Sequence, residues 1–267
     1  MMTKTSILSV YSLCITTAVA MLWLSTDKVL GASVSSLSLT EKAPLTTREQ
    51  LISSLKQDHF DVLIIGGGAT GAGAVLDAAT RGLKTALIEA SDYSMGTSSR
   101  STKLVHGGVR YLENAVKHLD HHEYALVRDA LHERKFFLQN APHLTRSLAI
   151  LTPTYSWWDA FYYWVGLKCY DFIAGRASLG KSEFISKEQA LARFPTLKKE
   201  GLKGAVLYYD GQFDDARMNI SIILSAIEKG AKAANYVRAI SLLKEDGRVV
   251  GVMAKDEVSG EVWPIRA

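Results

Sequence analysis

Residues 61–89 read DVLIIGGGATGAGAVLDAATRGLKTALIE, and this stretch decides the fold. The apolar run at 62–65 leads directly into glycines, a small-residue segment at 69–81 has a helical composition, and a second apolar run follows Gly82. Strands with continuous rather than alternating hydrophobicity are typical of a buried parallel sheet. The stretch therefore predicts a βαβ unit in an α/β protein with a Rossmann-like domain.

The glycines of this stretch predict a dinucleotide site. Gly66, Gly68 and Gly71 form the pattern GxGxxG, with Gly67 between the first two. In this pattern the first glycine permits a tight turn, the second lets a pyrophosphate approach the backbone, and the third lets the helix pack on the strand. Glu89 ends the second strand, where an acid can accept a hydrogen bond from a ribose hydroxyl. A glycine-rich turn without a ligand is the alternative.

A loop rich in small hydrogen-bond donors follows the second strand. From residue 96 it reads GTSSRST, so hydroxyl groups surround a single guanidinium. Such groups can bind phosphate and sugar-alcohol oxygens. A solvated loop without a ligand has the same composition. The position of the loop after the second strand favours a part in the dinucleotide site. The candidate residues are Thr97, Ser98, Ser99, Arg100, Ser101 and Thr102.

Several separated segments resemble one family of flavoenzymes. They are the stretch 61–116, APHL at 141–144, GLKCYD at 166–171 and YYDGQFDDAR at 208–217, and they occur in the family's order. The chain from about residue 58 onward resembles FAD-dependent glycerol-3-phosphate dehydrogenase of the mitochondrial or respiratory type. That family belongs to the wider group of FAD oxidoreductases that are similar to D-amino-acid oxidase.

The resemblance implies FAD as the cofactor and assigns residues to it. It implies that FAD is bound by Gly66, Gly67, Gly68, Gly71, Glu89, the loop from Thr97 through Lys103, Gly107 and Gly108. His106 is expected near the isoalloxazine ring, and Arg110 and Tyr111 are expected to face the substrate. An arginine suits a phosphate because its planar fork binds two oxygens at once.

The resemblance also implies a reaction. Sn-glycerol 3-phosphate would be oxidised to dihydroxyacetone phosphate by hydride transfer to the flavin, with electrons passing to ubiquinone. Two alternatives stay open. One is glycerol-3-phosphate oxidase, or a related FAD oxidase that uses oxygen. The other is a non-catalytic truncated product.

We expect four segments along the chain. Residues 1–57 read as a targeting or anchoring leader with a linker, and 58–147 as the first segment of the FAD-binding domain. Residues 148–213 read as part of a substrate or cap domain. Residues 214–267 read as a helix and an antiparallel β-meander that return to the FAD domain, with turns at Asp246-Gly247 and Ser259-Gly260. Family members continue further, so we expect a C-terminally truncated chain that is inactive and binds FAD weakly or not at all.

Two segments of the sequence are candidates for contact with a membrane. Residues 6–24 carry no charge and read as a signal peptide, a membrane anchor or an organelle-targeting leader. The resemblance implies the mitochondrial inner membrane, with a membrane of the secretory pathway as the alternative. The aromatic run at 155–172 reads either as core or as a segment at a bilayer interface.

The composition excludes other classes of function. The 267 residues carry a net charge of +4, which is spread out and gives no reason to expect nucleic acid. Two cysteines, Cys14 and Cys169, cannot form a disulfide framework. His118 and His122 are four residues apart but lack a third ligand, so no metal site is predicted.

Overall fold

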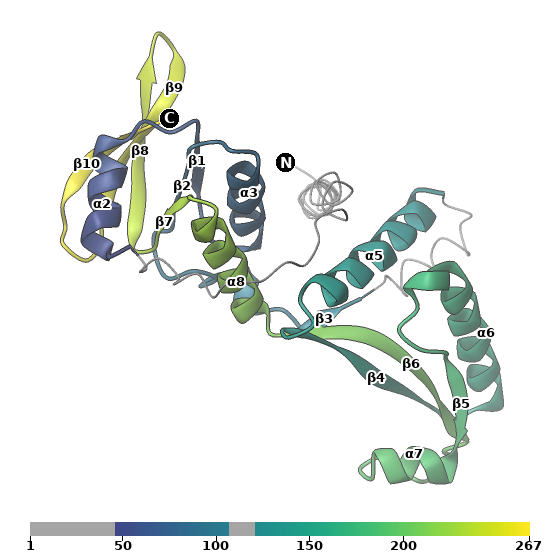
Figure 1. Cartoon of the computed structure of the whole chain (residues 1–267). Coiled ribbons are helices and arrows are strands. Elements are labelled where there is room, and N and C mark those ends of the chain that lie inside the picture. Colours follow the sequence, from purple (N-terminus) through teal and green to yellow (C-terminus); the bar gives the residue numbers. More distant parts are fainter. Residues whose placement is uncertain (1–45, 107–120) are drawn as a thin grey trace, which may run out of the picture. The chain divides into compact units, whose positions relative to one another are not determined.

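The structure is a computed structural model that describes residues 46–106 and 121–267 (Figure 1). These residues form two compact units. Within the described range, the first unit comprises 46–101 and 215–267, and the second comprises 102–106 and 121–214. The chain thus leaves the first unit after Ser101 and returns to it at Asp215, whereas the sequence-based division assigned residues up to 147 to the FAD domain.

A three-stranded parallel sheet forms the centre of the first unit, in the order β1-β2-β7. Strands β1 (Val62–Ile65) and β2 (Thr85–Ile88) are joined by helix α3 (Ala69–Thr80), and β7 (Lys232–Ala234) pairs with the other edge of β2. All four residues of β2 are buried, as a central parallel strand requires. The predicted βαβ unit and the Rossmann-like fold class are therefore confirmed.

The two faces of this sheet are covered differently (Figure 1). Leu87 packs with α3 and with α8 (Asp215–Glu228), while its neighbours Ala86 and Ile88 pack against a second, antiparallel sheet. This division follows from the alternation of side chains along a strand. The unit is thus layered as helices, parallel sheet and antiparallel sheet.

The antiparallel sheet is the predicted meander, in the order β10-β9-β8. Its strands are β8 (Val237–Glu245), β9 (Arg248–Asp256) and β10 (Val262–Arg266). Asp246 and Gly247 connect β8 to β9 with φ values of 49° and 78°. Two successive positive φ angles are the signature of the tight hairpin turn that Asp-Gly favours.

A helix that the sequence placed with the leader belongs to the core of the first unit. Helix α2 (Arg48–Gln57) begins at a capping box formed by Thr47 and Gln50. Ile52 and Leu55 are buried in the same cluster as the meander. Only these two side chains of α2 are buried, so its apolar pattern is too sparse to reveal the contact from sequence.

The second unit is an antiparallel sheet covered by helices. Strand β6 (Gly204–Phe213) pairs along its whole length with β4 (Thr145–Thr154), and its other edge pairs with β5 (Glu183–Ser186) and β3 (Leu104–Val105). The helices are α5 (His121–Asn140), α6 (Trp157–Ala174) and α7 (Lys187–Arg193). Helices α5 and α6 share a core that includes Leu131 and Tyr170.

Most of the aromatic run on α6 is exposed. The exposed rings include Trp157, Trp158, Phe161 and Phe172, whereas Leu167 and Tyr170 are buried. Across residues 46–106 and 121–267, no helix combines the length and the apolar character needed to cross a bilayer. The uncharged run at 6–24 lies outside the described residues.

Glu133 on α5 gives the second unit a pH-dependent stability. Burial, with a further contribution from Asp129, raises the pKa of Glu133 from 4.5 to about 7. Between these values the folded protein holds a proton that the unfolded chain releases. The free energy of unfolding should therefore fall as the pH rises through this window.

We expect Glu133→Gln to remove this dependence of the free energy of unfolding on pH. The variant should also be more stable than the unchanged protein at pH 8. Urea unfolding at several pH values measures the effect. Glu200→Gln, at an exposed position, is the control and should keep the original slope. Parallel stability curves for Glu133→Gln and the unchanged protein would contradict the prediction.

Candidate functional site

The glycine loop between β1 and α3 is shaped by close backbone contacts. Gly66 has a φ of +110°, in the region that favours glycine, and its N–H donates to the carbonyl of Ile88 at 2.8 Å. A Cβ on Gly71 would collide with the carbonyl oxygen of Gly66. A Cβ on Gly68 would lie 2.9 Å from Ser98 Oγ. Side chains at Gly68 and Gly71 would therefore collide with their surroundings. We call the loop 66–68 together with the start of α3 the glycine cradle.

Glu89 ties the end of β2 to this loop. Its carboxylate accepts the N–H of Gly67 at 2.7 Å and the N–H of Ser91 at 2.9 Å. A carboxylate has about four acceptor positions, so these two bonds leave capacity for a ligand hydroxyl. The contact of Glu89 with a ribose stays a prediction.

The polar loop meets the start of α3 through Ser98. Ser98 lies on the short helix η2 (Thr97–Ser99), and its Oγ accepts the N–H of Ala69 at 2.9 Å. The N–H of Ser101 donates to Asp215 at 2.9 Å, which fixes the end of the loop on α8. Arg100 is exposed. The loop thus brings the Ser98 hydroxyl to the first unit's glycine cradle, and it carries the exposed Arg100 two residues further along the chain.

The sequence did not reveal two residues that hold the cradle. The Asn219 side chain on α8 is 3% exposed, and its amide donates to the carbonyl of Gly67 at 2.8 Å and to Ser94 Oγ at 2.6 Å. The N–H of Ser94 donates to the same carbonyl at 3.1 Å. Asn219 follows Gly67 by 152 positions, so no local pattern points to this contact.

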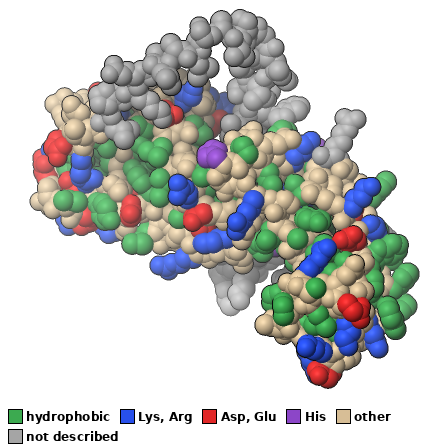
Figure 2. Space-filling model, turned by 60° about the horizontal axis from the view of Figure 1, so that its bottom comes forward, with side chains coloured by type: hydrophobic (Ala, Val, Ile, Leu, Met, Phe, Trp, Pro, Cys, Tyr) green, Lys and Arg blue, Asp and Glu red, His purple; other side chains and the backbone are tan. Residues whose placement is uncertain are grey.

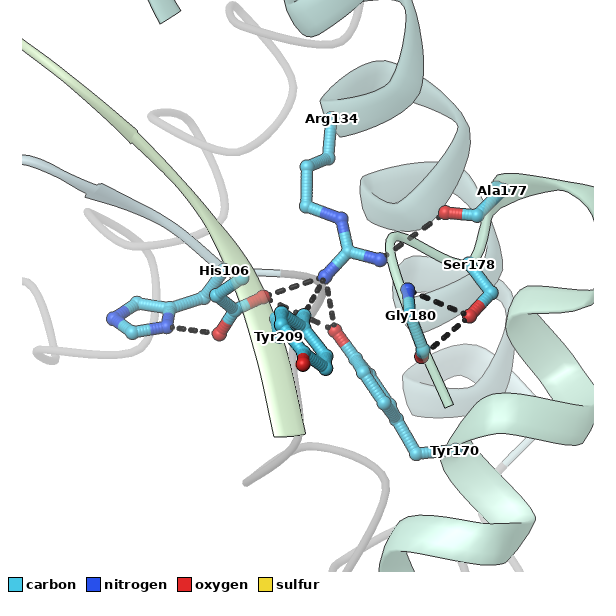
Figure 3. A network of polar contacts seen from close by, with 8 residues as sticks. His106, Arg134, Tyr170, Ala177, Ser178, Gly180 and Tyr209 are labelled. Carbon is cyan, nitrogen blue, oxygen red and sulfur yellow. Dashed lines mark hydrogen bonds and ion pairs between the residues drawn. The ribbon is translucent and has the colours of Figure 1, made fainter. Parts of the chain in front are cut away.

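A second polar centre lies in the second unit (Figure 3). His106 follows β3, and its Nδ1 lies 2.8 Å from Oδ2 of Asp210 on β6. Asp210 is fully buried and also pairs with Arg134 on α5. Sequence reasoning named His106 but gave no role to Asp210 or Arg134, because their partners are distant in the chain.

The predicted site residues divide into three groups. The first unit brings together Gly66, Gly67, Gly68, Gly71, Glu89 and Ser98, and its polar loop carries Thr97, Ser99, Arg100 and Ser101. Thr102, Lys103 and His106 belong to the second unit. Gly107, Gly108, Arg110 and Tyr111 lie outside the described residues, as does His118. In the part of the chain that the structure describes, no cluster of three or more His, Cys, Asp or Glu could hold a metal ion.

The parallel sheet, the glycine cradle and the acid at the end of β2 define a dinucleotide-binding α/β protein of the Rossmann type. Residues 61–267 match the family described as FAD dependent oxidoreductase, and the chain belongs to this family. FAD is thereby confirmed as the cofactor of the class. The cradle suits it, because the start of α3 offers N–H groups and a positive dipole end to a pyrophosphate.

Named relatives are similar over most of the chain. The mitochondrial glycerol-3-phosphate dehydrogenase of Homo sapiens is 51% identical over 85% of this chain, and a probable one from Caenorhabditis elegans is 55% identical over 86%. The glycerol-3-phosphate dehydrogenase of Bacillus halodurans complexed with FAD matches 82% of this chain with a TM-score of 0.60 and 34% identity. These findings confirm the resemblance seen in the sequence segments.

The match covers only part of those proteins. The chain spans about a third of the length of the curated relatives, at 32% of each, and 35% of the Bacillus halodurans chain.

We expect Gly71→Ala to destabilise the first unit by at least about 2 kcal/mol, because the new methyl group has no space beside the Gly66 carbonyl. Chemical unfolding measures the change. Gly166→Ala, where a Cβ on α6 meets nothing within 4 Å, is the control and should be neutral or stabilising. Equal stability of Gly71→Ala and the unchanged protein would show that α3 can move away from β1.

Proposed function

We propose that the protein containing this chain oxidises sn-glycerol 3-phosphate to dihydroxyacetone phosphate and passes the electrons to ubiquinone. The observation that carries the proposal is the identity of 51–55% to mitochondrial glycerol-3-phosphate dehydrogenases over 85–86% of the chain. The glycine cradle supports it, because such a dehydrogenase needs a site for FAD.

The residues of the first unit are proposed to hold FAD. Gly66, Gly68 and Gly71 would admit the pyrophosphate at the start of α3, and Glu89 would accept a ribose hydroxyl. When bound, FAD accepts a hydride from a carbon that bears a hydroxyl group. The hydroxyl proton must then pass to a base, for which His106 is our candidate.

Arg110 and Tyr111 are proposed to face the substrate. A guanidinium binds a phosphate through two parallel N–H donors, and such charge-assisted bonds are about twice as strong as neutral ones. We expect Arg110→Ala to raise KM for sn-glycerol 3-phosphate by about 30-fold or more, the equivalent of about 2 kcal/mol. Steady-state kinetics on the full-length protein measure it. Arg128→Ala removes an exposed arginine on α5 and should leave KM unchanged.

The electron acceptor is tested in the same protein. Reduction of a quinone analogue that depends on sn-glycerol 3-phosphate supports the dehydrogenase. Oxygen uptake with release of hydrogen peroxide would favour the oxidase instead. A protein that holds FAD but is not reduced by sn-glycerol 3-phosphate would contradict both.

We infer that α6 seats the protein on a membrane, where a quinone is dissolved. Trp157, Phe161 and Trp164 on α6 line an apolar pocket of about 250 Å³ together with Phe184 of β5. Trp and Tyr are favoured at the boundary between lipid and water. Figure 2 shows hydrophobic side chains gathered at the right-hand edge, the side on which Figure 1 labels α6.

The double change Trp158→Ser and Phe172→Ser should weaken binding to vesicles of phosphatidylcholine and phosphatidylglycerol by about tenfold or more. These rings are 74% and 87% exposed, and burying such a ring in lipid stabilises by roughly 1.5–3 kcal/mol. Cosedimentation measures the binding. The control changes Leu242 and Val249, which are exposed on the meander, to serine. An equal loss in both variants would contradict the role of α6.

The mitochondrial inner membrane is the proposed location, because the human relative is named as mitochondrial. A fluorescent fusion of residues 1–56 tests it. Entry of this fusion into the secretory pathway would favour the alternative.

A further inference from the structure

The side chain of Asp210 is a buried carboxylate shared by two cationic or basic partners. Its Oδ1 accepts from Nη1 of Arg134 at 2.5 Å, and its Oδ2 lies 2.8 Å from Nδ1 of His106. Asp210 is fully buried, and Arg134 is 1% exposed. Each oxygen therefore has a different partner, and the two partners come from α5 and from the segment after β3.

The surroundings of Arg134 fix the orientation of this carboxylate. Nη1 of Arg134 also donates to the hydroxyl of Tyr170 at 2.9 Å, and Nη2 donates to the carbonyl of Ala177 at 3.2 Å (Figure 3). The Tyr170 hydroxyl donates to Oδ1 of Asp210 at 3.5 Å. A guanidinium anchored at several points cannot swing away without leaving a buried charge unpaired, which is costly. Oδ2 is thus held toward His106.

His106 presents its other ring nitrogen away from this network. The imidazole is 49% exposed. In Figure 3 it lies on the opposite side of β6 from Arg134. The imidazole of His106 makes its hydrogen bond through Nδ1. Among the described residues, Nε2 has no hydrogen-bond partner. An ionised carboxylate only accepts, so the proton in the Nδ1 contact belongs to the imidazole. The neutral ring then carries its lone pair on Nε2.

We propose that Asp210 is a positioning residue that holds His106 in the Nδ1–H form, so that Nε2 is the base for the substrate hydroxyl. This inference rests on the proposed function. With FAD bound, the C2–H bond of the alcohol would break and the hydrogen would leave with the bonding electron pair as a hydride, reducing the oxidised flavin. The hydroxyl O–H bond breaks with its proton going to Nε2, and the C2–O double bond forms. The imidazolium that results keeps its Nδ1–H bond to the Asp210 carboxylate, which stabilises the new positive charge.

The tautomer can be measured without substrate or cofactor. Nitrogen-15 NMR of the histidine-labelled protein distinguishes a protonated from a bare ring nitrogen, and the signals that vanish in His106→Asn identify His106 among the seven histidines. We expect a protonated Nδ1 and a bare Nε2 in neutral His106. A neutral ring protonated at Nε2 would overturn the proposal, whatever the activity of the protein.

Kinetics test the role of the pair in the full-length enzyme. Asp210→Asn keeps the shape of the side chain but can donate to Nδ1, which favours the wrong tautomer. We expect kcat to fall by about 10²–10⁴-fold with KM within about threefold, because general-base catalysis contributes on that order. Asp171→Asn is the matched control, since Asp171 accepts from Ser182 in the same unit and does not contact His106. It should leave kcat within about twofold.

Stability is measured beside the kinetics, because Asp210→Asn leaves Arg134 without its counter-ion. Asp210→Glu keeps that charge and should recover part of kcat and the Nδ1–H signal. A loss of kcat in Asp210→Asn no larger than in Asp171→Asn would overturn the positioning role. If the unchanged protein does not oxidise sn-glycerol 3-phosphate, the proposed function fails and the base role of Nε2 fails with it. In that case the NMR result still decides whether Asp210 fixes the tautomer.

Discussion

The first unit depends on the contact between Gly71 on α3 and the carbonyl group of Gly66 at the end of β1. Because no side chain separates them, the helix lies against the strand and its first N–H groups stand at the glycine cradle. Three polar side chains then fix the middle of the loop and the first residue of α3. Glu89 holds the N–H of Gly67, Asn219 holds its carbonyl, and Ser98 holds the N–H of Ala69. The backbone conformation of this loop is therefore set before a cofactor binds, which reduces the ordering cost of binding.

The second unit is organised around a buried charge pair rather than a backbone contact. Arg134 and Asp210 are both removed from water, and the desolvation of such a pair is repaid only when its remaining donors and acceptors are satisfied. The Tyr170 hydroxyl and the Ala177 carbonyl accept hydrogen bonds from the two Nη atoms of Arg134 and so satisfy part of these donors. The pair therefore joins α5, α6 and β6 at one point, and it leaves one carboxylate oxygen for His106.

Local patterns predicted the parts of the fold that depend on neighbouring residues. GxGxxG and the Asp246-Gly247 turn act through backbone conformation over a few positions, so the βαβ unit and the meander could be predicted from sequence. Asn219 and Arg134 could not be, because each acts on a partner far away in the chain. The aromatic run on α6 is apolar on nearly every side, so its sequence could not distinguish buried rings from exposed ones such as Phe172.

The route of the chain through the first unit has a consequence for its synthesis. Strand β2 ends at Ile88, but β7, which pairs with its second edge, begins only at Lys232. A ribosome that adds about 5–20 residues per second needs roughly 7–30 s to bridge that interval. During this time the second edge of β2, a strand whose four residues are buried in the folded protein, is unpaired, and such edges recruit other chains. The intervening unit, whose strands pair among themselves, can fold before α8 and β7 emerge and complete the first unit.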